Sequence, residues 1–339
     1  MAQPQGMRDR NFPDHVCCLK KALYGLKQAP RAWYDALRLF LLGIGFVTSR
    51  ADTSLFILRQ QESTVYFLVY VDDLIITGSD PALVSRIIHQ LDSTFSTKDL
   101  GPLSFFCGIE VIPTTGGLLL SQRKYVLDLL TKHNMISSKA VPTPLATGTT
   151  LSANDGTPPV NATTFRQVVG GLQPLRMTRL DIAFAVNKLS QFMHALTSTQ
   201  WGTAKRLLRY LNGTRNLSIN LCSSTPISLH GYSDADWGGN PDDRTSTVAY
   251  VVFLGANPIS WSSTKQRTVA RFSTEAEYRV IASATAEIEW VKSLLHELGV
   301  TLPMTPVLYS DNLGAHLPLL EPSLSLSHEV PSSRLSFCS

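Results

Sequence analysis

Two adjacent acids, Asp72 and Asp73, lie inside a long apolar run and are the first candidates for chemistry. The residues on both sides of them, 65–71 and 74–79, are rich in the β-branched and aromatic side chains that favour strands. Consecutive strands need a turn, so the pattern predicts a hairpin with both acids at its tip. Neighbouring carboxylates repel each other and are costly to bury without partners. Because a divalent cation removes both penalties, we favour a metal site over a simple surface turn.

Three further acids, Asp234, Glu277 and Asp311, fall at the ends of predicted elements. Asp234 and Asp311 each follow a predicted strand, and Glu277 lies in the first turn of a long predicted helix. Two strand ends and a helix start can converge on one point. Carboxylates gathered there can hold two metal ions, which activate an attacking water and stabilise the leaving oxygen in phosphodiester cleavage. The arrangement therefore predicts a nuclease site of the ribonuclease H-like type.

Glu277, Asp311 and the neighbouring Asp236 also have purely structural explanations. Thr274, followed three residues later by Glu277, matches a capping box. Asp311 can form a turn where its strand ends, and Asp236 is as readily a loop cap as a ligand. We favour the nuclease interpretation because the three acids occupy equivalent ends in one strand–strand–strand–helix–strand order.

Two basic side chains, Lys205 and Arg209, lie one turn apart on a predicted helix. Such a pair can follow a nucleic-acid phosphate backbone. The alternative is the solvated face of an amphipathic helix, and the sequence leaves both interpretations open.

The elements that must position these residues begin with a block at 17–140, in which Trp33, Leu37 and Phe40 recur at helical spacing. Its predicted elements are a helix at 31–46, the hairpin, a helix at 81–95, strands at 105–111 and 117–120, and a helix at 124–132. Residues 141–226 follow as a linker, rich in Pro, Thr and Ser up to residue 160, and a mostly helical connection.

The last block, residues 227–316, is predicted to be a mixed α/β domain. Its predicted elements are strands at 229–233, 247–254, 259–262 and 307–310, with a helix at 275–298 before the last strand. The apolar stripe of that helix steps by three and four, so one face packs on a sheet. Gly299 is a natural C-cap. Residues 1–16 are unassigned, and the Ser- and Leu-rich residues 317–339 do not have the pattern of a packed domain end.

Composition narrows the class of protein. A chain of 339 residues with 44% hydrophobic residues can form two or three domains with real cores, and its net charge of +4 is compatible with a nucleic-acid partner. Five cysteines without a Cys-x-x-Cys pair argue against a disulfide framework or a zinc site. No apolar stretch reaches the roughly 18 residues of a membrane span, and residues 1–16 lack a signal-peptide core. We therefore expect an intracellular protein of the cytoplasm or nucleus with no membrane partner.

These residues together resemble the reverse transcriptase and ribonuclease H region of a copia-type retrotransposon Pol polyprotein. The resemblance spans about residues 16–315 and rests on segments in the family's order: LYGLKQAPRAWY (23–34), YVDD (70–73), KDLG (98–101), GIE (108–110), YSDADW (232–237), ISWSSTKQ (259–266), STEAEY (273–278) and DN (311–312). It implies an α+β fold, in which a partial reverse-transcriptase palm and thumb precede an α/β ribonuclease H-like domain with a mixed sheet.

For the first block, the resemblance implies DNA synthesis from deoxynucleotides on an RNA template with a DNA primer. Asp72 and Asp73 would hold the catalytic Mg²⁺, or Mn²⁺ in its place. Gln28, Pro30 and Tyr70 would lie where the template and the incoming nucleotide bind.

For the last block, the resemblance implies that Asp234, Glu277 and Asp311 hold the metal ions that cut the RNA strand of an RNA–DNA hybrid. The chain also departs from the family. Residues 1–22 contain no apolar strand that could carry the third polymerase acid, so we expect an N-terminally truncated copy that has lost polymerase activity. Residues 317–339 replace the family's continuation, and we expect an out-of-frame ending. The alternative is a non-catalytic remnant that is inert or binds nucleic acid; the oligomeric state is not predicted.

Overall fold

The computed structural model of the protein describes residues 2–18, 25–71, 73–95, 97–153, 155–158, 161–194, 196–311 and 325–327. Asp72 lies outside the described residues, as does most of the segment 317–339. The chain forms two compact units, Met1–Leu100 and Gly101–Ser339. The boundary between the units falls inside the range 17–140 that the sequence pattern groups as one block.

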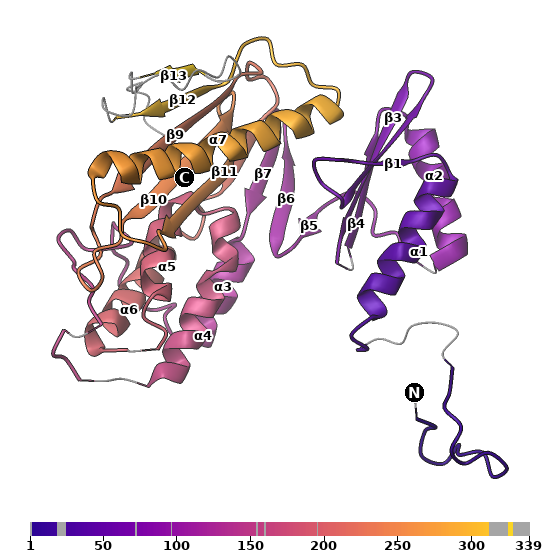
Figure 1. The fold of residues 1–339 in the computed structure, drawn as a ribbon, viewed down its shortest axis with the longest axis horizontal. Helices are drawn as coiled ribbons and strands as arrows, with labels where there is room; N and C mark the ends of the chain where they lie inside the picture. The colour runs from indigo at the N-terminus through magenta and orange to yellow at the C-terminus, as the bar shows by residue number, and fades with distance from the viewer. Residues whose placement is uncertain are drawn as a thin grey trace. The chain divides into compact units, whose positions relative to one another are not determined.

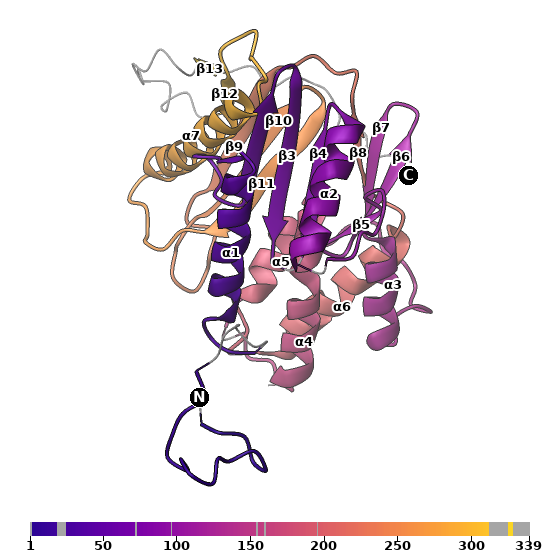
Figure 2. The ribbon, with the colours of Figure 1, turned by 90° about the vertical axis from the view of Figure 1, so that its right-hand side faces the viewer.

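The first unit is a four-stranded antiparallel sheet in the order β1-β2-β3-β4, with two helices on one face (Figures 1 and 2). Its elements are α1 (Ala29–Gly43), β1 (Val47–Thr48), β2 (Leu55–Gln60), β3 (Ser63–Tyr70), β4 (Asp73–Gly78) and α2 (Pro81–Phe95). Both predicted helices are confirmed. The first begins earlier than predicted because Pro30 fits the first helical turn, where its missing N–H costs nothing.

Side chains along β3 alternate between the buried face of this sheet and its other face. Val65, Phe67 and Val69 are buried and belong to one core with residues of α1 and α2. Tyr66 and Tyr70 alternate with them and therefore project from the face without helices. The hairpin predicted around the acid pair is confirmed, because β3 pairs with β4 up to Tyr70 and Asp73.

The second unit begins with a smaller antiparallel sheet, β5-β6-β7-β8, and a group of helices. These elements are β5 (Phe105–Phe106), β6 (Ile109–Thr114), β7 (Gly117–Ser121), α3 (Arg123–Lys132), α4 (Ala162–Leu172), η1 (Pro174–Met177), η2 (Leu180–Ile182), α5 (Ala183–Ser190), α6 (Ser198–Gly213) and β8 (Ile219–Cys222). The helices share a core that includes Phe165, Leu172 and Leu207. The paired strands and the mostly helical segment predicted for this region are confirmed.

The stretch predicted to be a linker is held against the helices by specific contacts. Leu151 is 1% exposed in the helical core, and Gln200 donates to the carbonyl oxygen of Ser152 at 2.6 Å. The backbone N–H of Ala153 donates to Asp242 at 2.9 Å. This strap, residues 141–153, is irregular in backbone but ordered by side chains that are distant in sequence, which a composition-based prediction does not detect.

The rest of the second unit is a mixed five-stranded sheet in the order β11-β10-β9-β12-β13, with one long helix across a face (Figure 1). Its elements are β9 (Leu229–Asp236), β10 (Thr247–Leu254), β11 (Asn257–Lys265), α7 (Ser273–Glu297), β12 (Val307–Ser310) and β13 (Ser325–Ser327). β9, β10 and β11 are antiparallel neighbours, whereas β12 runs parallel to both β9 and β13. The predicted strand–strand–strand–helix–strand order is therefore observed.

Helix α7 packs through the stripe predicted from its spacing. Ile281, Ala284 and Ile288 are buried in one core with Leu229 and Leu308 of the sheet. The helix ends as predicted before Gly299, whose φ of +81° places it in the left-handed region. Among the described residues, no helix combines the length and apolar character needed to cross a membrane.

Candidate metal centre

Asp234, Glu277 and Asp311 converge at one edge of the mixed sheet. Register pairing aligns Ser310 of β12 with Ser233 of β9, so Asp234 in β9 and Asp311 directly after β12 lie next to each other. Glu277 reaches the same edge from the first turn of α7. One carboxylate oxygen from each residue lies within 4.8 Å of the other two, and this is the one such group of three that the described part of the chain contains. Three carboxylates at this spacing are a donor set for hard divalent cations.

Glu277 is the buried member of the group, with 5% of its surface exposed. Its Oε1 accepts a hydrogen bond from the backbone N–H of Ala235 at 3.2 Å, whereas its buried Oε2 has no hydrogen-bond partner. Burial, and then the charges of Asp234 and Asp311, raise the pKa of Glu277 to about 7. An unpaired buried carboxylate oxygen is costly, and it is satisfied here by either a proton or a metal ion.

The capping-box explanation for Glu277 does not fit the observed helix start. The N-cap residue of α7 is Phe272, and the backbone N–H that Glu277 accepts comes from β9 rather than from the helix. Local stabilisation of the helix start comes from Glu275, which accepts from the backbone N–H of Arg271 at 2.7 Å and pairs with Arg279 at 2.6 Å. Glu277 is therefore free to serve the carboxylate group.

Asp234 shares the electrostatic environment of Glu277. Its pKa is raised by burial and by the neighbouring charge of Asp311, although the N–H of Ala235 opposes the shift. Asp236 contributes a smaller repulsion from two residues further along β9, and it is not a member of the three-acid group. Repulsion of this kind favours a site that takes up positive charge.

Asp73, the described member of the acid pair in the first unit, has a different environment. Asp73 is exposed and starts β4 opposite Tyr70, which is 50% exposed on the face of the sheet without helices. Val71 in the turn has a φ of +51°, a left-handed conformation that is rare for a β-branched residue. Such strain is maintained only where the surrounding hairpin enforces it, and it is frequent at functional sites.

Comparison with known proteins assigns the chain to a family. Residues 1–147 match the family described as reverse transcriptase (RNA-dependent DNA polymerase). Over 93% of its length, the chain is 54% identical to the retrovirus-related Pol polyprotein from transposon RE1 of Arabidopsis thaliana. It is also 32% identical to a putative transposon Ty5-1 protein of Saccharomyces cerevisiae, covering 84% of this chain and 94% of the yeast protein.

The chain belongs to the copia-type retrotransposon Pol family. A second Arabidopsis polyprotein, from transposon RE2, is 52% identical over the same share of the chain. This Pol-family chain spans 22% of the length of either Arabidopsis polyprotein. The resemblance inferred from the motifs is thus confirmed at the level of the family.

Two residues predicted near the template, Gln28 and Pro30, lie at the start of α1 in the Pol-family chain. Both are exposed, and the side chain of Gln28 forms no capping hydrogen bond although it occupies the N-cap position. Their proposed contacts with template and nucleotide stay predictions.

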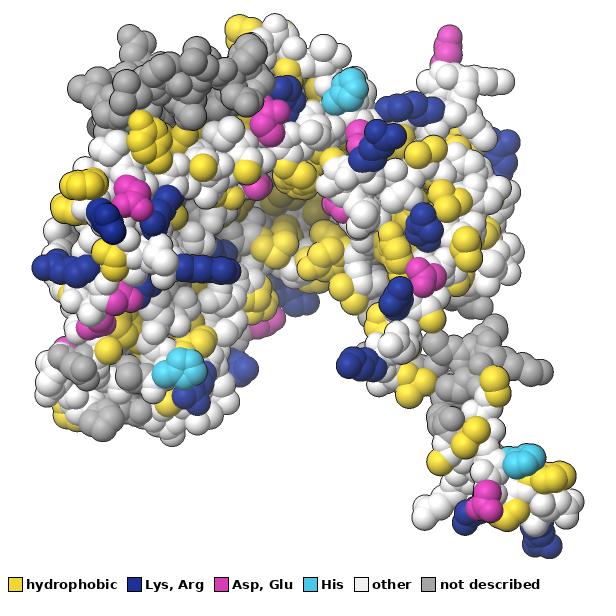
Figure 3. All heavy atoms as spheres, in the orientation of Figure 1, with side chains coloured by type: hydrophobic (Ala, Val, Ile, Leu, Met, Phe, Trp, Pro, Cys, Tyr) yellow, Lys and Arg dark blue, Asp and Glu magenta, His cyan; other side chains and the backbone are white. Residues whose placement is uncertain are grey.

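The predicted backbone-binding pair on α6, Lys205 and Arg209, has partners within the protein. The ammonium of Lys205 lies 5.1 Å from the ring centroid of Trp201, and Arg209 donates to the carbonyl oxygen of Lys139 at 2.7 Å. The face shown in Figure 3 carries lysine and arginine side chains interspersed with acidic ones in the second unit. These contacts favour an internal role for Arg209, and its role in binding nucleic acid stays a prediction.

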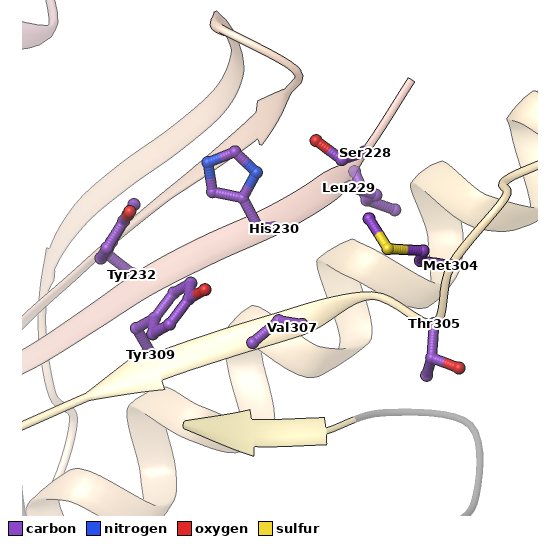
Figure 4. Close-up of a pocket in the computed structure, with 8 residues that line it drawn as sticks. All are labelled: Ser228, Leu229, His230, Tyr232, Met304, Thr305, Val307 and Tyr309. Carbon is purple, nitrogen blue, oxygen red and sulfur yellow. The ribbon is translucent and has the colours of Figure 1, made fainter. Parts of the chain in front are cut away.

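One feature beside the carboxylate group was not predicted. Tyr232 and Tyr309 precede Asp234 and Asp311 by two residues, and their rings stack with centroids 5.1 Å apart. With His230 they line a pocket of about 350 Å³ (Figure 4). Alternation places these rings opposite the α7 face of the sheet, and the stacked pair holds β9 and β12 together next to the acids. An aromatic residue two positions before Asp234 and another two positions before Asp311 are the signal that could have found the pair.

Proposed function

We propose that this Pol-family chain is a nuclease that cuts the RNA strand of RNA–DNA hybrids at Asp234, Glu277 and Asp311. The observation that supports this best is the convergence of three carboxylates around a buried, unpartnered Oε2 of Glu277. The strand order β11-β10-β9-β12-β13, with one helix crossing the sheet, supports a ribonuclease H-like fold for this region. The family relationship supports a nucleic-acid substrate.

The donor set fits Mg²⁺ or Mn²⁺, because all three ligands are carboxylates and one is buried without a partner. Bound there, divalent ions would supply an activated water and charge stabilisation for in-line phosphodiester cleavage. The protein's own contribution is to hold the acids in place: the N–H of Ala235 fixes Oε1 of Glu277, which leaves Oε2 available. Near neutral pH, Glu277 must release its proton before it can serve as a ligand.

We further propose that hybrid cleavage, rather than DNA synthesis, is the main activity of this chain. The support is the contrast between the two sites: Asp73, the described acid of the hairpin, is exposed, whereas Asp234, Glu277 and Asp311 converge around a buried carboxylate oxygen.

Cleavage of a labelled RNA–DNA hybrid by the purified chain tests the proposal. We expect cleavage that requires Mg²⁺ or Mn²⁺ and falls about 1000-fold in Asp234→Asn, because the variant keeps its shape but loses a charged ligand. Glu289→Gln, a partly exposed position further along α7, is the matched control and should cleave like the parent.

Absence of cleavage in the parent chain, with hybrid binding retained, would instead support a non-catalytic nucleic-acid-binding protein. Cleavage that persists in Asp234→Asn would place the active site elsewhere. Primer extension on an RNA template, measured with the same preparation, tests the statement about DNA synthesis.

A further inference from the structure

A second pocket lies beside the acid-bearing end of β9, and a buried lysine forms part of its lining. The pocket has a volume of about 130 Å³ and lies between the strap, α5 and the loop after β9. Its lining residues are Leu145, Thr149, Thr150, Leu151, Phe184, Lys188, Asp236, Gly239 and Pro241. Leu151 and Lys188 are buried, whereas Thr149, Thr150 and Asp236 are exposed, so the pocket is open at its rim.

Lys188 is 8% exposed, and its ammonium forms neither a hydrogen bond nor an ion pair with another described residue. Burial lowers the pKa of its ammonium, and the facing charge of Asp236 opposes the shift. A buried ammonium without a partner is costly. The ammonium therefore favours an acceptor within the pocket, where water and the carboxylate of Asp236 are the available groups.

The acids around Lys188 differ in how far they are already engaged. Asp242 accepts hydrogen bonds from Ser152 and from the N–H of Ala153. Asp243 pairs with Lys265 at 2.6 Å. The carboxylate of Asp236, in contrast, has no described partner and lies against Gly239, where any Cβ would come within 1.8 Å of it. Lys188 and Asp236 thus line one pocket as an unpaired donor and an unpaired acceptor.

This pairing of charges indicates the chemistry of the ligand. One cation and one anion give the pocket no net charge, so a phosphate would gain from Lys188 and be repelled by Asp236. A neutral hydroxyl group satisfies both, because its oxygen accepts from an ammonium while its O–H donates to a carboxylate. Leu145, Leu151 and Phe184 supply apolar walls for the carbon face of such a group.

The position of the pocket relates this ligand to the carboxylate group. Asp236 follows Asp234 by two residues on the same strand and the same face, about 7 Å along β9. A sugar bound at Asp236 would therefore belong to a nucleotide close to the one whose phosphate is at the acids. The 2′-hydroxyl is the group by which a protein distinguishes RNA from DNA.

We propose that this pocket binds a ribose of the RNA strand, with Lys188 donating to the oxygen of its 2′-hydroxyl and Asp236 accepting from the same hydroxyl. The inference rests on the proposed function, since it assigns the RNA specificity of the same site. Lys188 and Asp236 are specificity residues in this scheme and take no part in bond breaking.

Equilibrium binding without metal tests the proposal independently of cleavage. Fluorescence anisotropy in EDTA compares the full chain on an RNA–DNA hybrid and on a DNA duplex of the same sequence. We expect the parent chain to bind the hybrid more tightly than the DNA duplex. This preference should fall about tenfold in Lys188→Met and in Asp236→Asn, because each variant loses one charge-assisted hydrogen bond. The affinity for the DNA duplex should not change. Lys124→Met, an exposed lysine on α3, is the matched control and should keep the preference.

Hybrids in which one ribose at a time is replaced by 2′-deoxyribose sharpen the test. Replacement of the bound ribose should weaken binding to the parent chain. It should not weaken binding to the variants any further, because they have already lost the contact. An unchanged hybrid preference in both variants, or no preference in the parent, overturns the ribose assignment. Equal losses on hybrid and DNA, with a smaller salt dependence, would show a phosphate site instead. Asp236 is at the exposed rim, so its variant remains informative even if Lys188→Met is unstable.

The two proposals fail separately. A chain that cleaves hybrids but shows no effect of Lys188 and Asp236 on preference retains the nuclease function and loses the ribose pocket. A chain that prefers hybrids through these two residues but does not cleave them retains the pocket and loses the nuclease function.

Discussion

The acidic hairpin of the first unit and the carboxylate group of the second place acids in opposite environments. Asp73 is exposed at a turn between two neighbouring strands, and its position depends on local pairing alone. Glu277 is buried, and its position depends on a helix packed across a sheet and on an N–H from β9. The hairpin therefore forms from a short stretch of sequence, whereas the carboxylate group needs the whole second sheet.

This difference shows why family membership and activity have to be argued from different regions. A local motif is sufficient to recognise a Pol-family chain, because its residues are adjacent in sequence. Catalysis needs groups held in place before the substrate arrives, and in the described residues Asp234, Glu277 and Asp311 form one such group of acids. The proposed activity therefore rests on this group, which is assembled from distant segments.

The largest expected difference between the two regions is in their stability. Phe67 is fully buried in the core of the first unit, so Phe67→Ala should cost about 4 kcal/mol there through lost burial and a cavity. In hydrogen exchange, amides of β3 should lose protection about 1000-fold while those of β9 keep theirs, because the two units are separately compact.

Phe105→Ala is the control for this experiment, since its side chain is 58% exposed and its loss should change protection little. Equal loss of protection in β3 and β9 would mean that the two units unfold together. The hairpin and the acid group would then belong to one unit of unfolding, and the comparison between them would not extend to stability.

The next effect is the pH dependence of the carboxylate group. The pKa of Glu277 rises from 4.5 to about 7 on folding, so the folded protein retains a proton that the unfolded chain releases. Its contribution to stability is complete below pH 4.5 and is lost as pH rises through 7, a change of about 3 kcal/mol. Without metal, the contribution of Glu277 should therefore make the second unit easier to unfold at pH 8 than at pH 5.

Mg²⁺ should reverse this trend if Glu277 is a ligand as proposed, because a divalent ion binds the deprotonated carboxylate. Thermal unfolding with and without Mg²⁺ should show a stabilising shift at pH 8 that is much smaller at pH 5, and Glu277→Gln should remove both the pH effect and the metal effect. An equal response to Mg²⁺ at the two pH values would contradict the assignment of Glu277 as a ligand.

The parts of the fold that could be predicted were those in which apolar residues recur at regular spacing along the sequence. Ile281, Ala284 and Ile288 defined the core-facing stripe of α7, and the alternation around Phe67 defined a strand. The strap was not predictable, because Leu151 and Ser152 are held by residues far along the chain. Composition alone made that stretch resemble a flexible linker.

The acids of the candidate site could be predicted from the sequence, but the residues that contact them could not. Strand ends and a helix start identified Asp234 and Glu277, but the role of Ala235 as the donor that fixes Glu277 depends on tertiary packing. Lys188 was missed for a physical reason: a lysine in an α-helix is normally solvated, and its burial follows from α5 packing beneath the strap. Spacing along a helix does not indicate which polar residue the rest of the fold will cover.

The smallest effect concerns the hairpin itself. Val71 is 73% exposed, so it gains little from packing, and its φ of +51° carries a steric cost for a β-branched side chain. Asn tolerates the left-handed region, so Val71→Asn should stabilise the first unit by about 1 kcal/mol, measured as increased exchange protection in β3 and β4. Val47→Asn, at another exposed valine of this sheet with ordinary backbone, is the control and should not stabilise it. A loss of stability in Val71→Asn would show that the valine side chain itself supports the turn, and the hairpin would then depend on more than local pairing.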